Sequence, residues 1–231
     1  MKKMMALLLC LCLTLCCATA LAAGKLTVSQ ETYMPMLRYE SYYGYIFAEV
    51  TNAGDKNVEF GNGIFEILTA DGDPQESNDV YSCYPSILAP GETGYLFRYD
   101  VCKEAASLED IGDYTLTVSG KATKDEITPR VGASAEIAQG TYSWGDPYAK
   151  VTIMMSNTNE QDVLGLRGAY GVYDAEGKLI YADNIYNIDG VLLPTGQTVG
   201  FQQSVDSAIV EYWAANGITP ATVKAIVYVE D

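Results

Sequence analysis

Carboxylates are the most abundant reactive side chains of this 231-residue chain, which holds 30 Asp and Glu against 14 Lys and Arg and has no His. Without His, neither Ser-His-Asp nor Cys-His catalysis is possible, and no imidazole can bind a metal ion. No Gly-rich phosphate loop or dinucleotide fingerprint occurs either. Two carboxylates could still hydrolyse a glycosidic bond, but pairs such as Glu109-Asp110, or Glu76 with Asp79, are typical of solvated loops. We therefore expect no enzyme activity and no cofactor.

Asp71-Gly72-Asp73 is the one stretch that invites a calcium-binding interpretation. In an EF-hand loop, the sixth position must be Gly and the twelfth must be Glu. Counted from Asp71, these positions are Glu76 and Ser82. The stretch therefore predicts a turn rather than a metal site.

The first 22 residues have the composition of a secretory signal. Lys2-Lys3 precedes an apolar run at 6–17, and Ala20-Leu21-Ala22 supplies the small residues of a cleavage site. We expect cleavage after this segment, secretion of the mature chain, and no membrane span in it. A lipoprotein is the less favoured alternative, because Leu15 and Cys16 precede the available cysteines where a lipobox normally has Gly or Ala.

The strongly acidic balance restricts the possible partners. Loss of the signal would remove two lysines and no acid, so the mature chain would be more negative than the full-length value of −16. Such a charge argues against nucleic acid and anionic membranes as partners. We attribute it to solubility outside the cell, with a divalent cation or a cationic polymer as the alternative partner.

Two cysteines, Cys83 and Cys102, lie outside the signal. An even pair in a secreted chain predicts a disulfide. It would close a loop of about 20 residues and contribute on the order of 3 kcal/mol. Two thiols alone are too few for a metal site.

Two stretches 105 residues apart, Phe65–Gly72 and Tyr170–Gly177, share one pattern. Each has an aromatic and an aliphatic residue two positions apart, which in a strand lie on the same face. Each then ends in an acidic turn with a Gly that can take a positive φ. The same offset relates 52–93 to 157–198 without a gap. A period near 100 residues fits a duplicated domain rather than a solenoid.

Strand signals dominate both copies, as short β-branched or aromatic runs separated by Gly, Pro, Asn and Asp. A first strand is expected at Lys25–Gln30 and a last one at Val223–Val229. Glu104–Glu109 and Ser207–Asn216 predict short helical segments, the second between an Asp cap and a Gly stop. We divide the chain into a signal peptide at 1–22, a first domain at 23–120, a linker at 121–130 and a second domain at 131–231. So short a linker should hold the domains near each other without fixing their angle.

These motifs together resemble a known family. Tyr170–Gly177 and the Leu-Ala-Pro-Gly-Glu-Thr stretch at Leu88–Thr93 are similar to the FxLYD domain, an immunoglobulin-like module of secreted Gram-positive bacterial proteins. The first copy departs from it with Leu68 and Thr69 in place of Tyr and Asp, and the second copy has its Pro one place early in Leu193–Thr198. The resemblance implies an all-β protein of two tandem immunoglobulin-like β-sandwiches with no catalytic residues. Together with the two predicted helical segments, this gives each sandwich a short helical segment before its last strand.

We expect a non-catalytic extracellular binding or structural module with a protein partner, because edge strands of sandwiches can accept a partner strand. The alternative is carbohydrate binding through surface aromatics, for which Tyr42, Tyr43 and Trp144 are the candidates. Against that alternative, the Tyr-rich stretch Tyr33–Tyr45 is typical of ordinary strand aromatics with buried rings.

Overall fold

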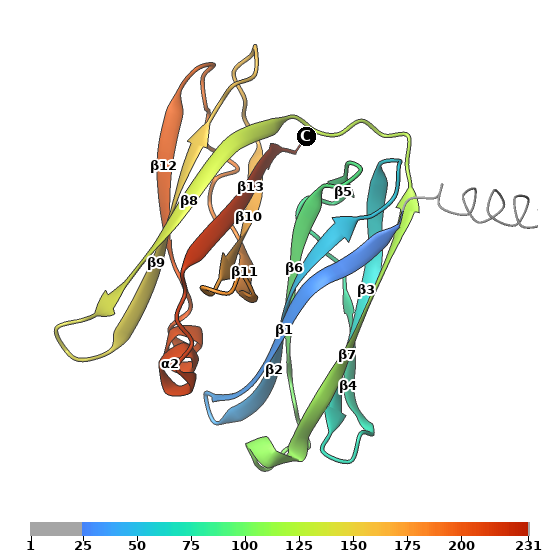
Figure 1. The fold of residues 1–231 in the computed structure, drawn as a ribbon, viewed down its shortest axis with the longest axis vertical. Coiled ribbons are helices and arrows are strands. Elements are labelled where there is room, and N and C mark those ends of the chain that lie inside the picture. Colours follow the sequence, from blue (N-terminus) through green and yellow to red (C-terminus); the bar gives the residue numbers. More distant parts are fainter. Residues whose placement is uncertain (1–24, 231) are drawn as a thin grey trace, which may run out of the picture.

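The computed structural model describes residues 25–230, so the predicted signal peptide at 1–22 and the lipoprotein alternative lie outside the described residues. The described chain is predominantly β, with antiparallel strands in several sheets and one α-helix, α2 (Ser207–Asn216). Figure 1 shows two groups of strands packed side by side and joined by an extended segment. No helix in this part of the chain is long and apolar enough to cross a membrane.

Residues 26–122 form the first group of strands, which we call the first repeat. One sheet has the order β1-β2-β6, and in the other β3 pairs with β4, β5 and β7. The strands are β1 (Leu26–Arg38), β2 (Ser41–Asn52), β3 (Val58–Thr69), β4 (Pro74–Val80), β5 (Ile87–Leu88), β6 (Thr93–Val101) and β7 (Ile111–Ala122).

Residues 130–229 form the second group, which we call the second repeat. Its strands are β8 (Arg130–Thr141), β9 (Pro147–Ser156), β10 (Leu166–Tyr173), β11 (Leu179–Asn184), β12 (Thr198–Ser204) and β13 (Thr222–Val229). They form one six-stranded sheet of order β11-β10-β13-β8-β9-β12. The sheet is continuous because β8 pairs with β9 along its length and with β13 through Arg130 and Val131.

The two repeats share most of their strand pairing, although only the second joins its two halves, through β8 and β13, into one sheet. The order β1-β2-β6 corresponds to β8-β9-β12, and β4-β3-β7 corresponds to β11-β10-β13. The correspondence extends to single hydrogen bonds around two buried asparagines, Asn52 and Asn157. In both, Nδ2 donates to the carbonyls 4 and 36 residues further on, at 2.8 and 2.9 Å. In both, Oδ1 accepts from the backbone N–H two residues on, at 2.9 Å.

The two predicted strand–turn–strand units are present. Phe65 and Tyr170 lie in β3 and β10, and the turns lead into β4 and β11. Gly72 and Gly177 have φ of 89° and 79°, in the left-handed region where a side chain would be strained. The pattern of acidic residue and Gly therefore marks the same turn in each repeat.

Two predictions about the bounds of elements need correction. β1 continues well past Gln30 because β2 pairs with it as far as Arg38 opposite Ser41. The predicted helix at Glu104–Glu109 is reduced to a 3₁₀ turn, η2 (Leu108–Asp110). The turn begins only at Leu108, because Ser107 is its N-cap and the Asp110 carboxylate accepts from the backbone N–H groups of Ala106 and Ser107, as in a capping box.

The helix predicted at Ser207–Asn216 forms with those bounds as α2. Its cap is Asp206, whose carboxylate accepts from the Ala208 N–H at 3.0 Å. It ends at Gly217, which has a φ of 65°. The apolar face of α2, which includes Trp213, is buried in the second repeat.

The β1-β2-β6 sheet is covered on both faces. β2 contributes Ile46 and Ala48 to the core of the first repeat. It contributes Tyr45 and Phe47, together with Tyr95 of β6, to a cluster that also contains the core of the second repeat. Figure 1 shows this sheet between the β3–β7 layer and β10–β11. The repeats are therefore held together by shared packing as well as by the segment between β7 and β8. The expectation that the linker leaves the angle between the domains free did not include this packing.

Cys83 and Cys102 are buried, but they are free thiols, so the predicted disulfide is not formed. The Cys83 thiol lies near the start of β6, where a Cβ added to Gly94 would be 3.0 Å from Sγ. Cys102 follows the other end of β6 and donates its N–H to the Tyr42 carbonyl at 2.8 Å. Eight residues of extended chain separate these ends by about 26 Å, whereas a disulfide requires Cα atoms within about 7 Å.

Candidate functional site

The two repeats meet at a polar contact inside an apolar interface. The Tyr95 hydroxyl of β6 lies 2.9 Å from the Tyr173 hydroxyl of β10, which also donates to the Glu49 carboxylate of β2. The rings of Phe47 and Tyr181 pack beside them, with centroids 5.0 Å apart. Burial raises the pKa of Tyr95 to about 12, so this hydroxyl is neutral at physiological pH.

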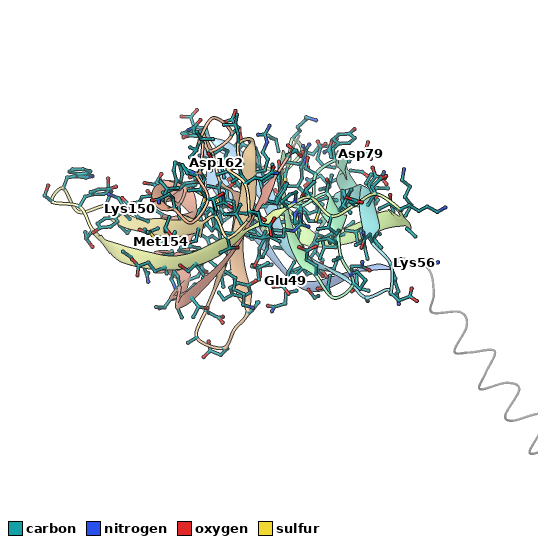
Figure 2. The ribbon with its side chains drawn as sticks, turned by 90° about the horizontal axis from the view of Figure 1, so that it is seen from above. Glu49, Lys56, Asp79, Lys150, Met154 and Asp162 are labelled. Carbon is teal, nitrogen blue, oxygen red and sulfur yellow. The ribbon has the colours of Figure 1, made fainter. Side chains whose placement is uncertain are left out.

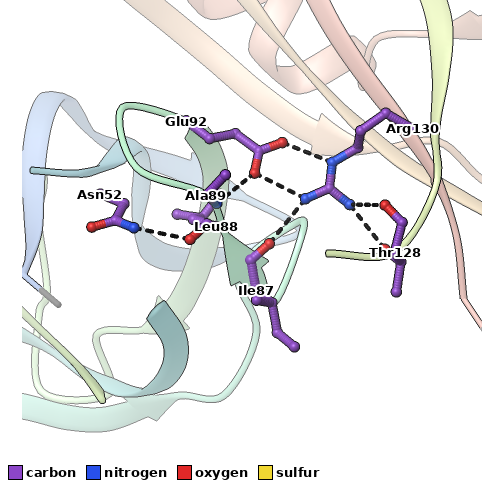
Figure 3. Close-up of polar contacts among 7 residues, drawn as sticks. All are labelled: Asn52, Ile87, Leu88, Ala89, Glu92, Thr128 and Arg130. Carbon is purple, nitrogen blue, oxygen red and sulfur yellow. Dashed lines mark hydrogen bonds and ion pairs between the residues drawn. The ribbon is translucent and has the colours of Figure 1, made fainter. Parts of the chain in front are cut away.

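A second contact connects the start of β8 to the first repeat (Figure 3). It consists of Arg130, Glu92, Ile87 and Thr128, and we call it the Arg130 cluster. Arg130 donates from Nε and Nη2 to the two carboxylate oxygens of Glu92, at 2.7 and 2.9 Å. It also donates to the carbonyls of Ile87 and Thr128, both at 3.0 Å. This bidentate pair is partly buried, which strengthens it relative to an exposed one.

Beside this interface a cleft of about 380 Å³ opens between β6 of the first repeat and β11 and β12 of the second. We call it the inter-repeat cleft. Its aromatic lining comes from both repeats and consists of Tyr45, Phe47, Phe97, Tyr99, Tyr181 and Tyr186. Its charged lining consists of Arg38, Arg98, Asp183 and Asp206.

Asp183 is the most buried charged residue of the cleft, with 8% of its surface exposed. Its carboxylate accepts from the hydroxyls of Tyr181 and Tyr186 at 2.9 and 2.8 Å, and from the Asn184 N–H at 2.8 Å. Burial raises its pKa, although these hydrogen bonds act in the opposite direction. Within residues 25–230, no Lys or Arg forms an ion pair with it.

The two arginines of the cleft are already paired. Arg38 binds Asp206 at 2.6 Å and the Tyr45 hydroxyl at 2.8 Å, so it also connects the repeats. Arg98 binds both carboxylate oxygens of its neighbour Asp100, at 2.7 and 3.0 Å. The cleft therefore contains one carboxylate that faces no cation.

The edge of β6 beside the cleft is open. Tyr95 exchanges two backbone hydrogen bonds with Tyr84, at 2.8 and 2.9 Å, so its N–H and C=O point away from β2. Because these groups alternate direction along a strand, Phe97, Tyr99 and Val101 point theirs to the same side. No strand of the described chain pairs with them there.

Two hollows adjoin this open edge. One, of about 400 Å³, runs along residues 97–101, and a smaller one of about 170 Å³ separates the edge from residues 79–82. They exist because the chain before Tyr84 leaves β6 to join β4 in the other sheet. The rings of Tyr81 and Tyr99 stand at this opening, with exposed fractions of 74% and 55%.

The three aromatics predicted to bind a sugar are not brought together. Tyr42 packs against the core of the first repeat. Tyr43 packs against the shared cluster, with its ring 6.2 Å from that of Tyr99 at the edge of the cleft. Trp144 lies in the turn between β8 and β9, where it is 69% exposed. Tyr42 and Tyr43 are both partly buried, on opposite faces of β2, and neither forms a flat exposed row with Trp144.

Trp144 has neighbours that its sequence context did not suggest. Its ring stacks on that of Tyr142 at 4.4 Å and 9°, and Tyr142 lies 4.7 Å from Tyr148. We call these three rings the hairpin aromatics. Figure 2 shows the β8–β9 hairpin, with Lys150 and Met154 labelled on it, extending to the side opposite Asp79 of the first repeat.

No group of three Cys, Asp or Glu side chains within residues 25–230 is arranged to hold a metal ion. Sequence reasoning did not identify Asp183 or Tyr99 as site residues, because neither belongs to a recognisable motif. One signal was available: Tyr45–Val50 is apolar at nearly every position, whereas a strand with one wet face alternates. Such a run indicates a sheet covered on both sides, and therefore an interface between the repeats.

Comparisons with known proteins add no functional relative. No family model matches the chain, and no curated protein sequence matches it. An exo-chitosanase of Amycolatopsis orientalis aligns over 84% of this chain and 26% of its own, at 11% identity and a TM-score of 0.24. A red sea bream transglutaminase aligns over 77% of this chain and 27% of its own, at 10% identity and a TM-score of 0.22. The chain spans about a quarter of the length of these proteins, and likeness at this level supports no functional conclusion.

Proposed function

We propose that this protein is a secreted, non-catalytic binding protein built from two tandem immunoglobulin-like repeats of FxLYD type, and that it binds a protein partner in the inter-repeat cleft. The immunoglobulin-like assignment is supported by the short motifs and by the two three-strand groupings, β1-β2-β6 with β8-β9-β12 and β4-β3-β7 with β11-β10-β13, that the repeats share. The proposed secretion is supported by the composition of residues 1–22. The absence of His from the sequence supports a role without His-dependent catalysis.

The observation that carries the proposal is that both repeats line one cleft with aromatic rings and charged groups. Concave sites with aromatic walls and a few convergent polar groups are the usual form of a binding site. The cleft also continues onto an open strand edge, which is a common place for a polypeptide to bind.

The test is retention of ligands by the immobilised protein, with isolated cell wall, a soluble-glycan panel and secreted proteins of the same cell offered separately. Ser204→Trp places a large ring at the cleft from an exposed position of β12 and should abolish retention of the partner. Ala215→Trp, on the exposed side of α2, is the matched control and should retain it. Equal retention by both variants would show that the partner does not use the cleft.

The second candidate is carbohydrate binding by the hairpin aromatics. It is favoured by the exposure of Trp144 and by its stacking on Tyr142, since flat rings held in place are suitable for packing against a sugar. Retention on a glycan that is lost in Trp144→Ala and kept in Ser204→Trp would place this function first.

A further inference from the structure

We infer that the partner binds as an extended segment that adds one strand to the open edge of β6 and directs a Lys or Arg side chain into the inter-repeat cleft toward Asp183. This inference rests on the proposed function and specifies the chemistry of its partner. It assigns a backbone recognition site and a side-chain recognition site that lie next to each other.

The backbone site is formed by three alternate residues of β6. Phe97, Tyr99 and Val101 each direct an N–H and a C=O to the open side, as fixed by the pairing of Tyr95 with Tyr84. The hollow of about 400 Å³ along residues 97–101 gives an incoming strand space beside these groups. Strand addition supplies affinity through the main chain, and pockets for alternate side chains supply specificity.

The side-chain site follows from the faces of β6. Side chains at Phe97 and Tyr99 point to the face that is shared with the second repeat, where they line the inter-repeat cleft. An added strand has the same alternation, so every second residue of the partner faces the cleft. That side chain meets the rings of Tyr45 and Tyr99, which lie 5.2 Å apart, and the Asp183 carboxylate beyond them.

Charge selects a basic side chain for this position. Arg38 and Arg98 are neutralised by their own carboxylate partners, whereas Asp183 is held only by neutral donors. Aromatic rings beside a carboxylate are the usual surroundings of a bound Lys or Arg, because a cation is attracted to the face of the ring as well as to the acid. The net charge of −16 also favours a basic partner over a second copy of this chain.

The second repeat provides an internal comparison. Its strand equivalent to β6 is β12, and the offset places Ser204 where the first repeat has Tyr99, and Asp206 where it has Val101. Asp206 is occupied as the cap of α2 and the partner of Arg38. The exposed ring and the adjoining hollows are therefore features of the first repeat, and we expect strand addition at β6.

The probe is a displayed library of random dodecapeptides selected on the full chain, with the enriched peptides then synthesised for affinity measurement. We expect enrichment of β-forming sequences with Lys or Arg at alternating positions. Tyr99→Pro removes an outward N–H without removing a bond to β2, and should weaken binding about tenfold relative to Tyr99→Val. Asp183→Asn should weaken a Lys peptide about tenfold and leave its Gln analogue unchanged.

Methylation of single peptide amides provides a second measurement that does not depend on the folding of Tyr99→Pro. Loss of affinity should alternate along the peptide, since only every second amide faces β6. No enrichment, enrichment without basic residues, or uniform effects of methylation would overturn the inference. The two proposals can fail separately. If Ser204→Trp no longer binds a secreted partner, but Tyr99→Pro and Tyr99→Val bind it equally well, strand addition is overturned and the proposed function stands.

Discussion

A Cβ placed on Gly171 of β10 would lie 2.5 Å from Cε1 of Tyr95 in β6. The backbone of the second repeat therefore lies so close to an aromatic ring of the first repeat that only a residue without a side chain fits there. Tyr95 is fixed in this position by its hydroxyl contact with Tyr173. The close approach of the two sheets, and with it the shape of the inter-repeat cleft, depends on this glycine.

Gly171→Ala should accordingly destabilise the protein by about 1–3 kcal/mol, because a methyl group is forced into a packed interface. Urea unfolding measures the loss, and small-angle scattering measures whether the repeats separate. Gly190→Ala is the matched control, since nothing lies within 4 Å of a Cβ at that position. If Gly171→Ala unfolds and scatters like the wild type, the repeats are not packed as described.

Asn52 and Asn157 should be equally important for the two repeats. Replacing either Asn by Ala leaves two carbonyls and one N–H of that repeat without their partner. We therefore expect each variant to lose about 1–3 kcal/mol in the free energy of unfolding. Asn216→Ala, which removes one exposed contact on α2, should change stability by less than about 0.5 kcal/mol. Urea unfolding of the three variants is the measurement, and unequal losses at Asn52 and Asn157 would contradict the structural equivalence of the repeats.

Local patterns in the sequence predicted local structure well. The acidic turn with Gly177, the equivalent turn at Gly72 and the cap and stop of α2 depend on neighbouring residues, so their chemistry is visible along the chain. The offset of 105 predicted that Asn52 and Asn157 are equivalent, and their hydrogen bonds agree. Turn and cap residues are informative because each satisfies a backbone group within a few positions.

Contacts between distant residues could not be predicted in the same way. The cleft depends on Tyr99 and Asp183, which lie in different repeats and belong to no motif. The disulfide prediction failed for the same reason, since the number of cysteines does not reveal that Cys83 and Cys102 lie at opposite ends of β6. Only the tertiary packing of the sheets decides these distances.

Arg130→Lys should weaken the connection between the repeats. A lysine cannot reproduce the planar, bidentate contact with Glu92 together with the bonds to Ile87 and Thr128, and we expect a loss of about 1–2 kcal/mol in the free energy of unfolding. Arg167→Lys tests the same change at a more exposed ion pair, with Glu230, and should lose no more than about 0.5 kcal/mol. Equal losses in the two variants would show that burial of the Arg130 cluster contributes nothing.

The free thiols predict a specific labelling pattern in the chain without residues 1–24. Burial raises the pKa of Cys83 to about 12 and that of Cys102 to about 11, so neither thiol forms the reactive thiolate near neutral pH. We expect little labelling of the native protein at pH 8, and labelling of both residues in denaturant without a reductant. The addition of a reductant should not raise the number of labelled thiols. If thiols appear only after reduction, Cys83 and Cys102 are oxidised in the protein.

The Asp183 carboxyl should make stability depend on pH in the acid range. Its pKa is raised in the folded state by burial, above the ordinary value of 3.8. The folded chain therefore holds this proton more tightly than the unfolded chain, and the contribution of Asp183 to stability falls as pH rises from 3.8 through the raised pKa. The change cannot exceed about 1.4 kcal/mol per pH unit.

Urea unfolding of the wild type and of Asp183→Asn at pH 4.5 and pH 7 isolates this contribution, because the amide does not titrate. The wild type should gain stability relative to Asp183→Asn at the lower pH. The groups that face Asp183 are Tyr170, Tyr181 and Tyr186, whose pKa values lie above their ordinary value of 10, and Asp206, which is paired with Arg38. Tyr186→Phe removes a hydrogen bond that favours the charged carboxylate, so it should raise the pKa further and enlarge the difference between the two pH values. A wild type that loses stability relative to Asp183→Asn on acidification would show that this carboxylate is stabilised in its charged form, and that a basic side chain has no unmet charge to bind in the cleft.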